Sequence, residues 1–210
     1  MKKIALIGYG QLGKQFEHLI LGSFADSTFI YFDDIAVKNG IKSAYPFKSY
    51  LENDFKDFEF QIALGYKHLS EKKEIIDNLI DRQRKMHTFI HSSAIVDCTA
   101  RIDTGTVIYP NVTIDKNVCI GKGCVINLSV TISHDSIVGD FCYLSPSVTL
   151  SGFVTIGQKV FLGTGVNVAN NVIINSSSIV GIGSVITKNI ESGQSVIGNP
   201  QRTIKGLNII

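Results

Sequence analysis

The sequence lacks an excess of charge of either sign. Its 20 basic and 18 acidic residues are mixed along the chain and leave a formal net charge of +2. A protein that binds nucleic acid usually carries a basic patch or stripe, which is missing here, and there is no acidic tail. We therefore expect no nucleic acid or other polyanionic macromolecule among its partners.

Long apolar runs are also absent. No stretch approaches the roughly 18 consecutive apolar residues that predict a membrane-spanning helix. The first residues, Met-Lys-Lys, lead into a patterned segment without the apolar stretch and small-residue cleavage site of a secretory signal. These features predict a cytoplasmic protein with no membrane partner.

Cysteines are few, and no Cys-x-x-Cys spacing brings two of them together. The four cysteines are Cys98, Cys119, Cys124 and Cys142. Structural zinc sites usually need closely spaced cysteine pairs, so we expect no metal. In a reducing compartment the thiols are expected to stay reduced.

What the sequence does contain is a repeat with a period of six residues. Every sixth residue from Ile90 to Ile186 is aliphatic, and the position four places after each is, with one exception, small or valine. Gly, Asp, Asn or Ser often follows the aliphatic residue, and these residue types tolerate turn conformations. A period of six fits neither an α-helix, at about 3.6, nor a coiled coil, at about 3.5.

One short strand and one corner account for a six-residue unit, so three units close a triangular coil of about 18 residues. Stacked coils would place their aliphatic side chains about 4.8 Å apart in an apolar column. Cys124 and Cys142 fall at the small position of neighbouring coils, where we expect core residues rather than a disulfide. No loop interrupts the repeat, which predicts a parallel β-helix over residues 89–191 with any chemistry on its outer faces.

The residues before the repeat, 1–88, alternate predicted strands with predicted helices. The expected elements are a strand over 3–8, the glycine turn Gly8-Tyr-Gly-Gln-Leu-Gly13, a helix to about Gly22, strands over 28–34 and 60–65, and a helix over 70–84 with Ser70 as candidate cap. This alternation predicts a small Rossmann-like α/β domain.

The glycine turn is suited to binding phosphate. A turn that leads into a helix presents unpaired backbone N–H groups and a favourable dipole, so Gly8, Gly10 and Gln11 are candidate nucleotide-binding residues. Asp33 and Asp34 end the second strand, where an acid can hold ribose hydroxyls. About 85 residues are too few for a full dinucleotide fold, which favours a mononucleotide moiety over NAD. The alternative is a small α/β unit whose glycines only form tight turns.

Together these features resemble the hexapeptide-repeat sugar acyltransferases, and among them the bacterial nucleotide-sugar N-acetyltransferases and sialic acid O-acetyltransferase-like proteins. The motifs that carry the resemblance are the glycine turn at 8–13, Asp33-Asp34, the segment 88–96 that opens the repeat, the repeat itself, and the closing Val196-Ile-Gly-Asn-Pro200. The resemblance covers the whole chain and implies a left-handed β-helix, a homotrimer with active sites between subunits, acetyl-CoA as co-substrate, and a C-terminal tail over 192–210.

The resemblance also nominates a catalytic pair. His134 matches the family's general base, and Asp135 follows it where relatives carry Asp or Glu to orient the imidazole. The chemistry agrees independently, because imidazole is the side chain best suited to accept a proton near neutral pH. By its position in the six-residue unit, His134 should point out of the coil. The other histidines, His18, His68, His87 and His91, are expected to be structural or surface residues.

Further site residues are implied by the same resemblance. Asn127 matches a position near the acceptor, and the Gly152 backbone N–H could bind the thioester carbonyl or the oxyanion. The remaining residues on the acetyl-CoA side are Gly181, Asn199 and Pro200. Asn and Gly also suit the corners of a β-helix, so each has a structural alternative. Relatives usually carry Ala after the closing proline, where this chain has Gln201.

The sequence thus predicts an acetyl-CoA-dependent N-acetyltransferase that acts on the amine of a nucleotide-linked amino sugar during synthesis of cell-surface glycan precursors. Three alternatives stay open. The first is O-acylation of a sugar or sialic acid hydroxyl, which the same base would serve. The second is acetylation of serine or another small metabolite, and the third is a non-enzymatic trimeric scaffold with a sensor unit.

Overall fold

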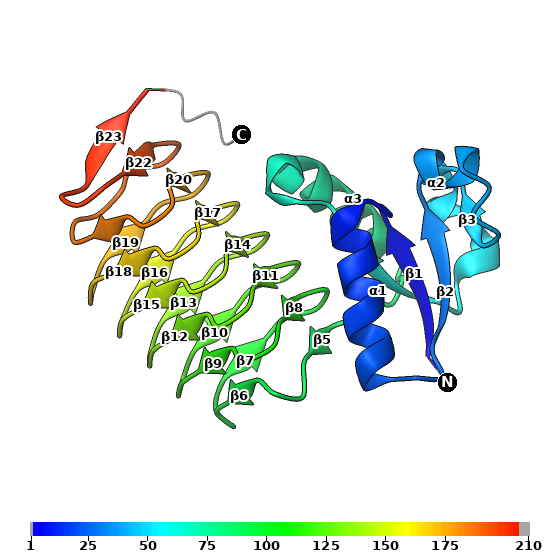
Figure 1. The fold of residues 1–210 in the computed structure, drawn as a ribbon, viewed down its shortest axis with the longest axis horizontal. Helices are drawn as coiled ribbons and strands as arrows, with labels where there is room; N and C mark the ends of the chain where they lie inside the picture. Colours follow the sequence, from blue (N-terminus) through cyan, green and yellow to red (C-terminus); the bar gives the residue numbers. More distant parts are fainter. Residues whose placement is uncertain (1, 206–210) are drawn as a thin grey trace. The chain divides into compact units, whose positions relative to one another are not determined.

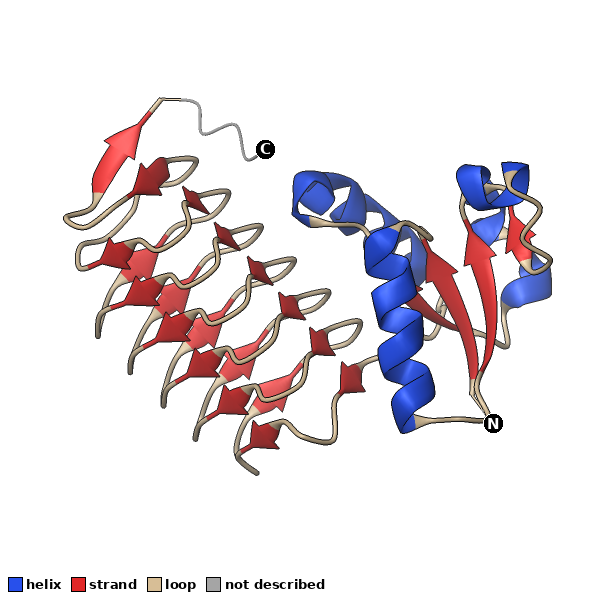
Figure 2. Ribbon diagram, viewed as in Figure 1, coloured by secondary structure: helices blue, strands red, loops and turns tan. Residues whose placement is uncertain are grey.

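The structure, a computed structural model, describes residues 2–205 and divides into two compact units, Met1–Phe89 and Ile90–Ile210. Residue 1 and the last five residues of the predicted C-terminal tail, 206–210, lie outside the described residues. Within the described chain, helices occur only in the first unit, whereas the second consists of short strands joined by turns (Figure 1 and Figure 2). None of the described helices has the length and apolar character needed to cross a membrane.

A parallel sheet of order β3-β2-β1-β4 organises the first unit. Its elements are β1 (Lys3–Ile7), α1 (Gln11–Ser23), β2 (Thr28–Phe32), α2 (Asp34–Lys38), β3 (Ala44–Tyr45), the 3-10 helices η1 (Phe47–Leu51) and η2 (Asn53–Phe55), β4 (Glu59–Ile62), the 3-10 helix η3 (Tyr66–His68) and α3 (Leu69–Asp81). The strand β1 pairs with β2 on one side and with β4 on the other. Its residues from Ile4 to Ile7 have no exposed surface, as expected of an apolar strand that is buried on both faces.

Two of the predicted details in this unit are wrong. The second strand ends at Phe32 rather than at residue 34, because the Asp33 side chain accepts a hydrogen bond from the Ala36 N–H and begins α2. Ser70 does not cap α3, because that helix begins at Leu69 with His68 at its cap position and no side-chain cap. The preceding 3-10 helix leads directly into α3, so no separate cap residue is needed to start it.

The second unit is a parallel β-helix, as the period of six predicts. We name its three sheets faces A, B and C. Face A contains β5 (Phe89–Ile90), β8 (Val107–Ile108), β11 (Val125–Ile126), β14 (Tyr143–Leu144), β17 (Phe161–Leu162), β20 (Ile179–Val180), β22 (Ser195–Ile197) and β23 (Arg202–Ile204). Face B contains β6 (Ile95–Val96), β9 (Thr113–Ile114), β12 (Thr131–Ile132), β15 (Thr149–Leu150), β18 (Asn167–Val168) and β21 (Val185–Ile186). Face C contains β7 (Arg101–Ile102), β10 (Cys119–Ile120), β13 (Ile137–Val138), β16 (Thr155–Ile156) and β19 (Ile173–Ile174).

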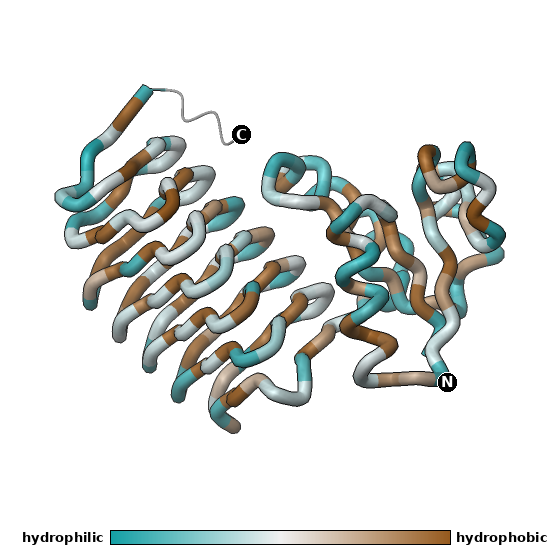
Figure 3. Tube along the Cα trace, viewed as in Figure 1, coloured by the Kyte–Doolittle hydropathy of each residue, from teal (hydrophilic) through white to brown (hydrophobic). Residues whose placement is uncertain are grey.

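Hydrogen bonds between neighbouring coils hold the faces together, and through most of the stack they set residues 18 positions apart in register. For example, Thr131 of β12 is in register with Thr113 and Thr149 of the coils on either side. The aliphatic position from Ile108 to Ile186 is at most 3% exposed in every coil, so the predicted apolar column is the core. Figure 3 shows the resulting alternation of apolar and polar segments along the coils. Ile90 is 43% exposed, because its coil has none before it to cover it.

Corners connect the faces, and many place a non-glycine residue in the left-handed backbone region. At the B–C corner, which follows face B, Asn117 has φ of 58°, Asp135 of 59° and Phe153 of 60°. Each such turn bonds back to the preceding coil, as when the Asp135 N–H donates to the Lys116 carbonyl oxygen over 3.0 Å. The cost of the left-handed backbone is lowest for Gly, Asn and Asp, which explains their frequency in the repeat.

The two stacked cysteines are core residues, as predicted. Cys124 and Cys142 are buried and free. Each thiol lies close to a carbonyl oxygen of the next coil: the Cys124 Sγ is 3.1 Å from that of Gly139, and the Cys142 Sγ is 2.9 Å from that of Gly157. Burial raises the pKa of the Cys142 thiol well above its ordinary value, and the neighbouring Cys124 raises it further, so the Cys142 thiol is a poor nucleophile.

The carboxyl end of the β-helix is closed by a glutamine. In earlier coils the residue that follows a face B strand donates its N–H to the next coil, as Ser133 does to Leu150. Thr187 holds this position in the last coil, where Gln201 Oε1 accepts hydrogen bonds from the N–H groups of Thr187 and Lys188 over 2.7 and 2.9 Å. The Gln201 amide also donates to the Lys188 carbonyl oxygen over 3.1 Å. At this corner the glutamine side chain therefore takes the place of the next coil, which gives the unusual residue after the proline a structural role.

We expect Gln201→Ala to lower stability by about 1–2 kcal/mol, because three hydrogen bonds at an exposed site are lost together. The change should appear as a lower melting temperature and as faster hydrogen exchange of the Thr187 and Lys188 amides. Gln158→Ala is the matched control, since the exposed Gln158 side chain makes no hydrogen bond to another described residue. Equal exchange at these two amides in both variants would show that the glutamine contributes nothing.

Candidate active site

The B–C corner of the coil that contains β12 carries the predicted catalytic pair. His134 lies two residues after Ile132, and its side chain is 38% exposed on the outside of the coil. The backbone at this corner is fixed on both sides. The His134 N–H donates to Asp115 Oδ2 of the preceding coil over 3.2 Å, and the His134 carbonyl oxygen accepts from the Phe153 N–H of the following coil over 3.1 Å.

The imidazole and the neighbouring carboxylate are in contact. His134 Nδ1 lies 3.0 Å from Asp135 Oδ2, and the other carboxylate oxygen, Oδ1, accepts from the Asn117 side-chain amide over 3.0 Å. Hydrogen bonds from Asn117 and then from His134 hold the pKa of the Asp135 carboxyl below its ordinary value. An ionised carboxylate can only accept, so Nδ1 carries the proton and the Nε2 lone pair of the neutral ring is left available. This is the arrangement that a general base requires.

A glycine of the next coil makes room for the imidazole. A Cβ atom at Gly152 would lie only 2.7 Å from His134 Cε1 and 2.8 Å from Nε2. The glycine is therefore required by the approach of the ring, since its own backbone is not in the left-handed region. Phe153 meets the ring edge-on, with centroids 5.1 Å apart and planes at 87°. The ring is thus held by a carboxylate, a glycine and an aromatic edge.

The backbone N–H of Gly152 is a further feature of the site. Among the described residues it donates to no oxygen, whereas the Gly152 carbonyl accepts from the Asn171 N–H over 3.2 Å. A donor next to an imidazole with an available lone pair is suited to stabilise an oxyanion that forms beside the base. The role that the sequence suggested for this glycine is therefore chemically feasible at this position.

The structure does not bring Asn127 to His134 within one chain. Asn127 follows β11 at the A–B corner, so the two residues stand at opposite ends of the face B strand β12. Asn127 is 8% exposed, its amide donates to the Tyr143 hydroxyl over 3.2 Å, and its Oδ1 accepts from the Leu128 N–H over 2.8 Å. Tyr143 was not predicted from the sequence, because its place in the repeat is that of an ordinary outward strand residue.

The residues predicted on the acetyl-CoA side are also spread over the coils. Gly181 lies at the A–B corner, where an added Cβ would lie 2.5 Å from Ile197 Cγ2, so packing alone explains the glycine. Asn199 and Pro200 are exposed in the turn between β22 and β23. Of the residues predicted in the β-helix, only His134, Asp135 and Gly152 form one cluster within a single chain.

In the first unit each glycine of the glycine turn has a different structural role, as in a turn that binds phosphate. Gly8 has φ of +90°, which permits the sharp turn after β1. Gly13 lies against the Gly8 carbonyl oxygen with no space for a side chain. Gly10, at the amino end of α1, has open space where a Cβ would stand and a backbone that any residue adopts. Gln11, the first residue of α1, is exposed.

The carboxylates at the end of β2 are engaged by the backbone. Asp33 Oδ2 accepts from the Tyr9 N–H over 2.8 Å and Oδ1 from the Ala36 N–H over 2.9 Å, so it fixes both the glycine turn and the start of α2. Asp34 Oδ1 accepts from the Phe47 N–H over 2.9 Å. Each carboxylate oxygen can accept a second hydrogen bond, so ribose contacts are compatible with this arrangement.

A second carboxylate clamps the same turn. Glu17 of α1 accepts hydrogen bonds from the Tyr9 and Tyr31 hydroxyls over 2.6 and 2.5 Å, and the two rings lie 4.0 Å apart. Burial, and then the adjacent Glu17, raise the pKa of Tyr9 and Tyr31, so both phenols stay protonated as donors. No sequence pattern indicates a role for Glu17, since a single acid on a helix is common.

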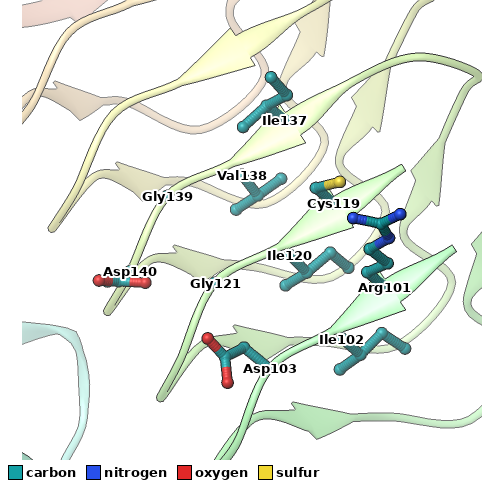
Figure 4. Close-up of a pocket in the computed structure, with 10 residues that line it drawn as sticks. All are labelled: Arg101, Ile102, Asp103, Cys119, Ile120, Gly121, Ile137, Val138, Gly139 and Asp140. Carbon is teal, nitrogen blue, oxygen red and sulfur yellow. The ribbon is translucent and has the colours of Figure 1, made fainter. Parts of the chain in front are cut away.

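A hollow of about 540 Å³ lies elsewhere, on the outside of face C. Its lining includes Arg101, Asp103, Cys119, Ile137 and Asp140. Figure 4 shows the side chains of Arg101 and Cys119 toward one end and the two carboxylates toward the other. None of the predicted site residues lines this hollow, and nothing in its shape or charge assigns it a ligand.

Sequence comparison gives no match to a protein-family model and none to a curated protein. Solved structures, however, match nearly the whole chain. The acetyltransferase domain of PglB from Neisseria gonorrhoeae FA1090 shares 26% identity, covers 97% of this chain and 100% of its own, and superimposes with a TM-score of 0.87. A structure of that domain in complex with acetyl coenzyme A gives the same TM-score and identity and covers 97% of this chain and 99% of its own.

Two further structures share the fold. WeeI from Acinetobacter baumannii AYE has 21% identity, coverage of 97% of this chain and 100% of its own, and a TM-score of 0.85. PerB from Caulobacter crescentus, in complex with CoA and GDP-perosamine, has 24% identity, coverage of 97% of both chains and a TM-score of 0.81. The likeness to the acetyltransferase domain supports the predicted resemblance to acetyltransferases, and WeeI and PerB show that the fold is shared.

We expect Gly152→Ala to displace the His134 ring, because the added methyl group would occupy the space that the ring fills. The expected cost is about 1–3 kcal/mol, visible as a lower melting temperature. The control is a double-mutant cycle with His134→Ala, in which the glycine substitution should cost nothing once the ring is gone. If Gly152→Ala lowers stability equally in both backgrounds, the glycine serves the coil and not the imidazole.

Proposed function

We propose that this chain is an acetyl-CoA-dependent N-acetyltransferase that acts on the amine of a nucleotide-linked amino sugar, in the synthesis of cell-surface glycan precursors. The observation that carries the proposal is the His134 ring, held by Asp135 and Gly152 with Nε2 available, on a fold shared with an acetyltransferase domain that binds acetyl-CoA. The complex of PerB with CoA and GDP-perosamine supports the choice of a nucleotide-linked sugar.

The chemistry needs a base, an oxyanion donor and a leaving group. His134 Nε2 accepts the amine proton as the nitrogen forms a bond to the thioester carbonyl carbon. The carbonyl oxygen takes up negative charge, which the Gly152 N–H stabilises, and the carbon–sulfur bond then breaks to release CoA as thiolate. Asp135 stabilises the imidazolium that forms, and the imidazolium returns the proton to the thiolate. No covalent acyl-enzyme is required.

We propose a left-handed β-helix that assembles as a homotrimer, with each active site shared between two copies. The positions of Asn127 and His134 support this arrangement, because they stand at opposite ends of one face and could meet only across a boundary between copies. In such a trimer Gly181, Asn199 and Pro200 of the A–B side would border the acetyl-CoA. The activity belongs in the cytoplasm, where acetyl-CoA and nucleotide sugars are available.

The first unit is proposed as a Rossmann-like nucleotide-binding domain over residues 1–88. Gly10 and Gln11 would face the phosphates with backbone N–H groups that donate to no other described residue. Gly8, whose N–H donates to the Phe32 carbonyl oxygen, would shape the turn beside the phosphates. Asp33 and Asp34 would hold ribose hydroxyls. The β-helix of residues 89–191 would supply the base, and the tail of 192–210 would complete the acetyl-CoA side. O-acylation of a sugar hydroxyl would use the same base, so the two reactions are distinguished by whether the product is an amide or an ester.

We expect His134→Ala to lower kcat/KM by roughly 10²- to 10⁴-fold while acetyl-CoA binding stays intact. Turnover is measured by mass spectrometry with a panel of nucleotide-linked amino sugars, and binding by calorimetry. His91→Ala is the matched control, because that imidazole lies in the first coil and bonds Ser93.

The product distinguishes N-transfer from O-transfer. A product that resists hydroxylamine is an amide, whereas cleavage by hydroxylamine indicates an ester and O-transfer. No acetyl-CoA binding by the wild type would support a scaffold.

The role of the glycine turn is tested by Gly10→Val. An added Cβ meets no other part of the described chain within 4 Å, so the fold should be kept. The melting temperature should fall only slightly, because valine is a poorer helix N-cap than glycine. A phosphate bound at this turn would be crowded, and the KM for the nucleotide sugar should rise about tenfold or more while that for acetyl-CoA stays the same. Gly22→Val, at the opposite end of α1 and equally open, is the control. An unchanged KM for the nucleotide sugar would place the nucleotide elsewhere.

A further inference from the structure

We infer that Asn117 is a positioning residue for the reaction, which acts through Asp135 to fix the proton and the orientation of the His134 imidazole. The inference rests on the proposed function for its catalytic consequence. Its structural content, the control of an imidazole by a residue of another coil, stands on the geometry of the B–C corner alone.

The contacts form a continuous path across two coils. Asn117 lies 18 positions before Asp135 and donates from its side-chain amide to Asp135 Oδ1 over 3.0 Å. The other oxygen, Oδ2, lies 3.0 Å from His134 Nδ1. Each oxygen of the carboxylate thus has its own partner, one from the coil before and one from the catalytic ring.

Asn117 is itself held in place. Its backbone N–H donates to Thr99 Oγ1 over 2.7 Å, and that hydroxyl donates to Asp97 Oδ1 over 2.6 Å. The corner therefore carries a ladder of hydrogen bonds from Asp97 through Thr99 and Asn117 to Asp135. The amide reaches the carboxylate from a fixed backbone rather than from a flexible surface chain.

The physical reason for such a residue is the freedom of the aspartate. The terminal torsion of an aspartate side chain is broad, so a carboxylate with one partner can rotate and release the other. Asn117 removes that freedom by binding one oxygen, which leaves the second oxygen directed at Nδ1. Since an ionised carboxylate only accepts, this holds the neutral imidazole in the tautomer with hydrogen on Nδ1 and a lone pair on Nε2. Only that tautomer can take a proton from a substrate through Nε2.

Other charged groups at this corner do not replace Asn117. Asp115 accepts from the His134 backbone N–H and from the Lys116 N–H, so both of its oxygens are used by the backbone. Lys116 lies close enough to favour the ionised form of Asp135, but it makes no hydrogen bond to that carboxylate within the described residues. The Asn117 amide is the neutral donor that orients the carboxylate without competing with the imidazole for its charge.

An alternative is that Asn117 only suits the left-handed corner. Asn111 provides a matched comparison, because it has φ of 59° against 58° for Asn117 and its N–H likewise donates to a hydroxyl 18 residues earlier, that of Ser93. The residue 18 positions after Asn111 is Ser129, not an acid. The two asparagines thus share the backbone conformation of a corner, Asn111 at the A–B corner and Asn117 at the B–C corner, and differ in what their side chains can orient. Glycine replaces either without backbone strain, since it tolerates the left-handed region.

The test compares Asn117→Gly, Asn111→Gly and the wild type in two measurements. The first is the nitrogen chemical shifts of the His134 ring, which report the tautomer without any turnover. The second is steady-state kinetics with acetyl-CoA and the nucleotide sugar. In Asn117→Gly we expect the Nδ1-protonated fraction to fall and kcat to drop about tenfold, with both KM values within about twofold. Asn111→Gly should match the wild type in both measurements.

A wild-type tautomer and kcat in Asn117→Gly would overturn the inference. If Asn117→Gly alters the tautomer while even the wild type transfers no acetyl group, the positioning role stands and the proposed function fails. Asn117→Asp guards against a folding defect of the glycine variant, since aspartate also tolerates this corner. A carboxylate there repels Asp135 instead of binding it, so its tautomer and kcat should depart from the wild type at least as far as those of Asn117→Gly.

Discussion

The hydrogen bonds between neighbouring coils are the constraint on which the second unit depends. They set residues 18 positions apart in register through most of the stack, so each of these residues stands directly over another that the sequence alone identifies. This register decides which side chains fill the core and which reach solvent. It also decides which side chains meet at a corner, and thereby places a glycine beside the His134 ring and an amide beside Asp135. The candidate site is therefore a product of the repeat rather than an insertion into it.

Much of this architecture could be predicted because the period of six leaves few alternatives. The outward direction of His134, the core position of Cys124 and Cys142, and the strand–turn–helix of the glycine turn follow from local pattern. The ends of the elements are harder to predict. Asp33 caps a helix where the sequence predicts a longer strand, and α3 begins without Ser70 as its cap. These boundaries depend on hydrogen bonds that compete locally, and residue type alone does not decide between them.

The candidate site was only partly predictable. Register arithmetic places residues 117, 135 and 153 at equivalent positions, but it does not say that an amide reaches a carboxylate or that a ring stacks on Gly152. Those contacts depend on side-chain torsions and on how closely the coils approach. Asn127 precedes His134 by only seven residues, yet the face B strand separates the two within one chain, so closeness in sequence does not place them together. The Tyr9–Glu17–Tyr31 clamp joins residues whose spacing carries no signal at all.

The regular stacking has a consequence for how such a chain can change over time. Loss or gain of a single amino acid within a strand of the solenoid would shift the register of the residues that follow, so that side chains of the core would face solvent. Adding or deleting 18 at once preserves all alignments and merely lengthens or shortens the stack. The stack can therefore change length by whole coils, and a base near the middle keeps its immediate neighbours when coils are added or lost at either end. Insertions or deletions of one residue within a strand would therefore disturb the site, whereas those of a whole coil at either end would leave it intact.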